Sequence, residues 1–128
     1  MTDSEKTILI IEDHAPVRLA LVEKLTHEGL KTIEAKDGEE GLELALKEKP
    51  GVILLDIIMP RMSGMTMLEK LRKDAWGKTV PVIILTNLNP DDKIMREIVE
   101  TEPVYYLVKA DWKIEDVVNK VKEVLPKE

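Results

Sequence analysis

Short runs of Ile, Leu and Val alternate along the chain with longer stretches in which apolar residues recur at helical spacing. This alternation is typical of a parallel sheet whose strands are connected by helices that cover both faces. Apolar runs that no polar residue interrupts indicate central strands buried on both sides. The sequence therefore predicts five strands, at Thr7–Ile11, Lys31–Ala35, Val52–Leu55, Val80–Leu85 and Val104–Val108.

Helix-starting and helix-ending residues lie between the predicted strands. Pro16 can occupy the first turn of a helix that Gly29 ends, and Asp37 followed by Glu40 resembles a capping box. Pro50 stops this second helix. The third helix is predicted to run from about Gly64 through Leu68 and Leu71. Asn89-Pro90-Asp91 is predicted to cap the fourth. The apolar faces of the last two helices are predicted at Ile94, Met95, Ile98 and Val99, and at Ile114, Val117, Val118, Val121 and Leu125.

The order of strands and helices predicts an α/β fold, a doubly wound five-stranded parallel sheet of flavodoxin-like type. A chain of 128 residues, 44% of them apolar, can build one continuous core but not two. We therefore expect residues 1–128 to form a single domain without a separate output domain. In such folds ligands bind at the carboxyl ends of the strands.

The composition argues against several kinds of function. The formal net charge is -6 at pH 7, which repels a phosphate backbone, so we expect no direct binding to nucleic acid. The absence of cysteine rules out disulfides and thiolate metal sites. No apolar run reaches bilayer length, and the N-terminal one is too short for a secretory signal. We therefore expect a soluble, cytoplasmic protein without membrane contact.

Reactive side chains follow four of the five predicted strands. Glu12 and Asp13 follow the first, Asp56 the third, Thr86 the fourth and Lys109 the fifth. Because three acids at one sheet edge repel one another, the fold needs a hard cation or a basic group to compensate them. Mg²⁺ prefers oxygen ligands, accepts one or two carboxylates and bridges to phosphate oxygens. The Lys109 ammonium group and the Thr86 hydroxyl could then contact a phosphoryl group.

The segment around the third strand end carries the most specific motif. It runs Asp56-Ile57-Ile58-Met59-Pro60-Arg61-Met62-Ser63-Gly64, and it resembles the D-x-x-M-P-x-M-x-G segment of the receiver domains of two-component response regulators. With Glu12-Asp13, Thr86 and Tyr106-Leu107-Val108-Lys109, the chain is similar to this family, and to its single-domain chemotaxis-regulator-like type, over essentially its whole length.

The resemblance implies the ligands of a Mg²⁺ cofactor. Asp56 would be the phosphoacceptor and a metal ligand, Asp13 a direct ligand, and Glu12 a ligand acting mainly through water. The backbone carbonyl of Ile58 would complete the protein ligands. Glu12 stands where Asp is more common in the family, and we expect activity to survive this change.

The resemblance also implies the groups that respond to the phosphoryl group. Lys109 would bridge it to Asp56, and Thr86 and Tyr106 would be the pair that changes position on phosphorylation. Lys109 is followed by Ala110 where Pro is usual. Since a cis peptide bond before a residue other than proline costs about 3–4 kcal/mol, we expect this bond to be trans.

Simpler roles exist for some of these residues. Glu12 or Asp13 could cap the helix that begins near Pro16, and such capping is compatible with metal binding by one of them. His14 and His27 lie on a polar helix surface without partners at ligand spacing, so we interpret both as solvated surface residues.

A signalling role follows from these expectations. A sensor histidine kinase or a histidine phosphotransfer protein would donate a phosphoryl group to Asp56, and the domain would catalyse only its own phosphorylation and dephosphorylation. A downstream protein would bind the face built from the fourth helix, the fifth strand and the fifth helix. An alternative is an unphosphorylated scaffold that keeps the site as a relic. A flavodoxin-like electron carrier is disfavoured because no phosphate-binding loop rich in Ser, Thr or Gly follows the first strand.

Overall fold

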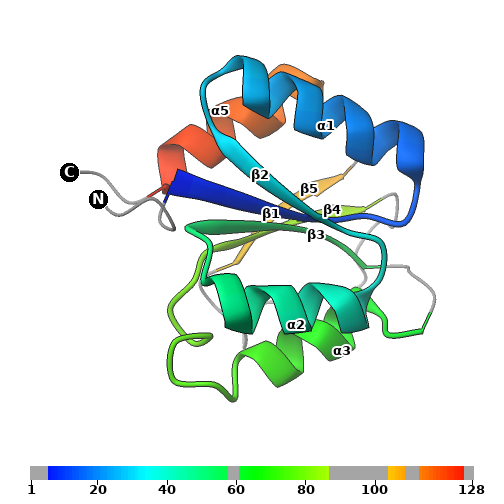
Figure 1. Cartoon of the computed structure of the whole chain (residues 1–128), viewed down its shortest axis with the longest axis vertical. Helices are drawn as coiled ribbons and strands as arrows, with labels where there is room; N and C mark the ends of the chain where they lie inside the picture. Colours follow the sequence, from blue (N-terminus) through cyan, green and yellow to red (C-terminus); the bar gives the residue numbers. More distant parts are fainter. Residues whose placement is uncertain (1–5, 58–60, 87–103, 109–112, 126–128) are drawn as a thin grey trace.

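The computed structural model describes residues 6–57, 61–86, 104–108 and 113–125. A five-stranded parallel sheet runs through these residues in the order β2-β1-β3-β4-β5 (Figure 1). The strands are β1 (Thr7–Ile11), β2 (Lys31–Ala35), β3 (Val52–Asp56), β4 (Val82–Thr86) and β5 (Val104–Val108). The helices are α1 (Ala15–His27), α2 (Gly38–Glu48), α3 (Gly64–Leu71) and α5 (Ile114–Val124). The predicted doubly wound parallel fold is confirmed, and the predicted fourth helix lies outside the described residues.

The helices form two layers around the sheet. Helices α1 and α5 cover one face, and α2 and α3 cover the other (Figure 1). Alternate residues of β1 enter different hydrophobic clusters: Ile8 and Ile10 pack with residues of α1 and α5, whereas Leu9 and Ile11 pack with residues of α2 and α3. All five residues of β1 are buried, so the unbroken apolar run marks a central strand, as the sequence predicts.

The predicted bounds of two strands were wrong by one or two residues. Strand β3 extends to Asp56, and β4 begins at Val82 and ends at Thr86. Pro81 has no N–H to donate and contributes only its carbonyl, which accepts a hydrogen bond from the Ile53 N–H at 3.1 Å. The Val80 carbonyl accepts from Arg72 Nη1 at 2.8 Å instead of from a neighbouring strand. Regular pairing of β4 therefore starts after the proline.

The expected helix boundaries are largely confirmed. Pro16 lies in the first turn of α1, and Gly29, just beyond its end, has φ +84°, a conformation that favours glycine. An Asp37 carboxylate oxygen accepts the Glu40 N–H at 2.8 Å and so caps α2. Ser63 caps α3 in the same way.

A capping role for Glu12 or Asp13 was wrong. The N-cap of α1 is His14, whose side chain makes no capping hydrogen bond. Both acids lie before the helix begins, so their side chains project from the segment between β1 and α1. Among the helices that the structure describes, none is both long and apolar enough to cross a membrane.

Candidate metal and phosphoryl site

Three carboxylates converge at the carboxyl ends of two neighbouring strands. Glu12 and Asp13 directly follow β1, and Asp56 is the last residue of β3. One oxygen atom from each carboxylate lies within 4.8 Å of the other two. Glu12 and Asp56 are buried, at 2% and 7% exposure, whereas Asp13 is exposed. The structure thus brings together the three acids that the sequence singled out.

The chemistry of this cluster suits Mg²⁺. Octahedral Mg²⁺ holds oxygen atoms at 2.0–2.1 Å, so cis ligands lie about 3 Å apart and trans ligands about 4.2 Å apart. A limit of 4.8 Å therefore accommodates direct ligation and ligation through a water molecule. Burying two carboxylates next to a third is unfavourable unless positive charge or hydrogen bonds offset the repulsion. Asp13 is exposed, so its carboxylate is accessible to water.

Close backbone contact positions the phosphoacceptor candidate. The Gly64 N–H, at the start of α3, donates to the Ile57 carbonyl at 2.8 Å. A Cβ atom at Gly64 would overlap the Asp56 carbonyl oxygen and lie 2.8 Å from Ile57 Cα. Only glycine allows α3 to start this close to the end of β3. The glycine of the D-x-x-M-P-x-M-x-G segment therefore has a steric role, which the sequence alone did not reveal.

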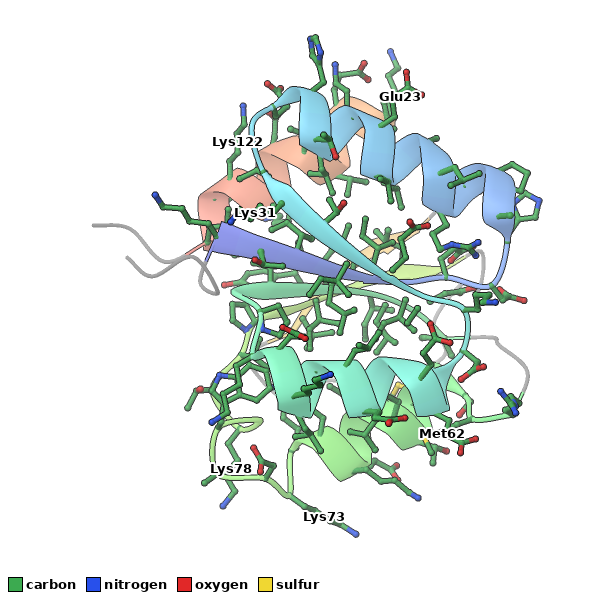
Figure 2. All side chains as sticks on the ribbon, viewed as in Figure 1. Glu23, Lys31, Met62, Lys73, Lys78 and Lys122 are labelled. Atoms are coloured by element: carbon green, nitrogen blue, oxygen red, sulfur yellow. The ribbon has the colours of Figure 1, made fainter. Side chains whose placement is uncertain are left out.

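The segment between β3 and α3 also contacts the N-terminus of α2. A Cβ atom at Gly38 would overlap the Met62 carbonyl oxygen, and Met62 lies beside that end of α2 in Figure 2. Arg61, at φ +68°, places Nη1 3.2 Å from an Asp37 carboxylate oxygen. The Glu40 N–H, and then Arg61, lower the pKa of Asp37 below its ordinary 3.8. These contacts connect Arg61 and Met62 to the N-terminus of α2.

The ends of β3, β4 and β5 lie in register. Asp56 is paired with Leu85, and Thr86 is paired with Val108, the residue before Lys109. The backbone of Tyr106 pairs with Ile84, two residues before Thr86. The backbone register thus aligns the carboxyl ends of the strands that carry these candidates.

Two candidates fall outside the described residues, namely Ile58 and Lys109, together with Ala110. His14 and His27 are exposed on α1 and its N-cap, in keeping with the interpretation as surface residues. Arg18 was not considered at the level of sequence, yet its side chain contacts the backbone of Glu12. Its position five residues after Asp13, about one turn into a helix, was the available signal.

Comparison with known proteins agrees with this fold. The family model of the response regulator receiver domain matches residues 8–122. Protein PilH of Pseudomonas aeruginosa is 38% identical over 88 residues, which cover 68% of this chain and 73% of PilH. Histidine kinase P4 of Formosa agariphila is 39% identical over 88 residues, which are 68% of this chain but 6% of that kinase. The chain also spans about a third of the length of a probable transcriptional regulator of Guillardia theta, ycf27.

Solved structures resemble the chain over nearly its whole length. Chemotaxis protein CheY4 of Vibrio cholerae is 26% identical with a TM-score of 0.83, and the alignment covers 93% of this chain and 98% of CheY4. Response regulator TrrA of Thermotoga maritima, solved in complex with Mg²⁺ and BeF, is 29% identical with a TM-score of 0.80. That alignment covers 94% of this chain and 99% of TrrA.

Proposed function

The chain belongs to the family of response regulator receiver domains, and from that premise we propose that it accepts a phosphoryl group on Asp56 with the help of Mg²⁺. Receiver domains are regulatory domains of two-component signalling. The observation that carries the proposal is the cluster of Glu12, Asp13 and Asp56, whose carboxylate oxygens lie within 4.8 Å of one another. TrrA, the similar protein solved with Mg²⁺ and BeF, supports the choice of metal.

In the proposed reaction, an Asp56 carboxylate oxygen attacks the phosphorus of a phosphohistidine donor. An O–P bond forms, the N–P bond breaks, and the imidazole of the donor leaves. Mg²⁺, held by the three carboxylates and by the Ile58 carbonyl, would neutralise charge on the phosphoryl oxygens. The buried position of Asp56 fixes the direction of its carboxylate, and the exposed Asp13 side admits the donor. Lys109 would then contact a phosphoryl oxygen.

The proposed donor is a sensor histidine kinase or a histidine phosphotransfer protein, and the proposed output face includes β5 and α5. Thr86 and Tyr106, on the neighbouring strands β4 and β5, would transmit the change to that face. Tyr105 and Lys120 belong to it: Lys120 Nζ, on α5, lies 5.2 Å from the centroid of the Tyr105 ring. This contact supports a surface on which both elements respond together.

Intact-mass spectrometry tests the proposal. The protein is incubated with acetyl phosphate in the presence of Mg²⁺ or of excess EDTA. We expect one phosphoryl adduct with Mg²⁺ and none with EDTA, and no adduct in Asp56→Asn, which keeps the shape but removes the nucleophile. Asp74→Asn is the matched control, because Asp74 precedes β4 and so lies toward the amino ends of the strands, away from the carboxyl ends where Asp56 lies.

Two outcomes would contradict the proposal. Equal phosphate uptake by Asp56→Asn would assign the phosphoacceptor to another residue. A wild-type chain that stays unmodified with acetyl phosphate and with a phosphorylated histidine kinase would favour the alternative, an unphosphorylated scaffold.

A further inference from the structure

The segment that carries Glu12 and Asp13 is held by a single arginine. Arg18, one turn into α1, donates from Nη1 to the backbone carbonyl of Glu12 at 2.8 Å. Its Nε donates to a Glu34 carboxylate oxygen on β2 at 3.0 Å. The Arg18 side chain is only 12% exposed and its bond to the Glu12 carbonyl is partly buried, whereas the Glu34 side chain is 41% exposed, so the ion pair lies at the surface.

These contacts complete a support around Glu12. The Glu12 N–H donates to the Ala35 carbonyl of β2 at 3.0 Å, which continues the pairing of β1 and β2 past the strand end. With Arg18 on the carbonyl, both polar groups of the Glu12 backbone are bound. The direction in which Glu12 and Asp13 leave the sheet is therefore fixed on both sides.

Glu34 also balances the positive charge of Arg18. The guanidinium bound to the backbone of Glu12 carries a positive charge, which would oppose the binding of a metal cation by the carboxylates of the same segment. The ion pair between Arg18 Nε and the Glu34 carboxylate, on β2, balances part of the charge of the guanidinium. A planar guanidinium can bind a carbonyl and a carboxylate through two nitrogen atoms at fixed angles, which the point charge of a lysine cannot reproduce.

We propose that Arg18, with Glu34 as its counter-charge, is a positioning residue that sets the affinity of the carboxylate cluster for Mg²⁺. This inference rests on the magnesium site proposed above. Groups that orient metal ligands without touching the metal change metal affinity by about 10–100-fold when they are replaced. Arg18 orients the ligands through the backbone of Glu12.

The substitution Arg18→Gln separates positioning from a simple effect of charge. If Arg18 acted only through its charge, its removal would strengthen Mg²⁺ binding, because one repelling cation would be gone. If Arg18 positions the ligands, its removal weakens Mg²⁺ binding despite that gain. The two explanations thus predict opposite signs for one measurement.

The test titrates Mg²⁺ by calorimetry and follows phosphorylation by acetyl phosphate as a function of Mg²⁺ concentration. We expect the Kd for Mg²⁺ to rise about tenfold in Arg18→Gln, and also to rise in Arg18→Lys and Glu34→Gln. At saturating Mg²⁺ the phosphorylation rate of these variants should return toward the wild-type rate. A role confined to stability would not produce this recovery. Circular dichroism establishes that each variant is folded.

Glu28→Gln is the matched control for Glu34→Gln. Glu28 caps the other end of α1 and pairs with Lys122 of α5 at 3.3 Å; Lys122 is labelled in Figure 2. The control removes the same charge from an ion pair of the same helix without touching Glu12, and its Kd should stay at the wild-type value.

The outcomes separate this inference from the proposed site. An unchanged or lower Kd in Arg18→Gln and Arg18→Lys, with a raised Kd in Asp13→Asn, overturns the role of Arg18 and leaves the magnesium site intact. A wild-type chain that does not bind Mg²⁺, or an Asp13→Asn variant with the wild-type Kd, overturns the magnesium site and this inference with it.

Discussion

Replacement of Gly64 by alanine tests how the start of α3 positions the end of β3. The added Cβ would overlap the Asp56 carbonyl oxygen and lie 2.8 Å from Ile57 Cα and 3.0 Å from the Asp56 carbonyl carbon. These are all backbone atoms, so no side-chain rotation can relieve the contact. Either α3 must move outward, with loss of the hydrogen bond from Gly64 to Ile57, or the backbone of Asp56 must shift.

The size of the effect follows from two opposing terms. Overpacking costs about 3 kcal/mol at the upper end of its usual range, which a backbone contact justifies. Alanine returns about 1 kcal/mol through its higher helix propensity. The net loss is about 2 kcal/mol. An unfolding entropy of about 2.1 cal/mol/K per residue over 128 residues is about 0.27 kcal/mol/K, so Tm should fall by about 7 °C.

Gly29, which is remote from the site, supplies a control variant that should lose a similar amount of stability. Gly29 has φ +84°, and a Cβ added there would meet no atom within 4 Å, so Gly29→Ala is penalised only by its backbone conformation. That conformation costs an alanine about 1–2 kcal/mol, which lowers Tm by about 4–7 °C. Thermal unfolding is followed by circular dichroism, and phosphoryl uptake at 25 °C is followed by intact mass.

We expect both variants to lose stability but only Gly64→Ala to take up phosphate more slowly. If Gly64→Ala keeps the wild-type Tm and the wild-type rate, the argument from close contact fails. If Gly29→Ala is slowed as much as Gly64→Ala, the loss of activity follows from stability and not from the position of Asp56.

Two further predictions concern capping and the core. Asp37→Ala should lose about 1 kcal/mol at pH 7 because α2 loses its cap. Since hydrogen bonds lower the pKa of Asp37 in the folded state, its contribution is complete well above pH 3.8 and disappears as the pH falls through the lowered value. Urea unfolding should therefore show the difference from wild type shrinking below pH 3.8. Leu54→Ala, at a side chain that is 1% exposed, should lose about 2–5 kcal/mol, whereas Leu19→Ala, at 55% exposure, should change stability by less than about 0.5 kcal/mol.

The sequence predicts the sheet well because local pattern and tertiary environment agree there. An uninterrupted run such as Ile8–Ile11 can be stable only where both faces are covered, and the structure covers both. The start of β4 was predicted two residues early because hydrophobicity does not show where pairing begins. That boundary depends on Pro81 and on the bond from Arg72 to the Val80 carbonyl, a contact between segments eight residues apart.

The carboxylate cluster was predictable for a topological reason, whereas its supports were not. Parallel strands place their carboxyl ends on the same side of the sheet, so acids at the carboxyl ends of β1 and β3 must come close if the two strands are neighbours. The contacts of Gly64 with Asp56 and of Arg18 with Glu12 depend instead on how near a helix approaches a strand end. Residue type and spacing do not encode that distance.

The acids of the cluster are held by different layers of the molecule. Arg18 fixes the Glu12 backbone from the side of α1 and β2, whereas Gly64 brings the start of α3 against the end of β3 that carries Asp56 (Figure 1). A cation bound to all three carboxylates would therefore join two separately supported segments across the sheet edge. Because the carboxylates repel one another without it, the cation would contribute most where both supports are intact. A change in either support should then alter metal binding even though neither Arg18 nor Gly64 offers a carboxylate ligand.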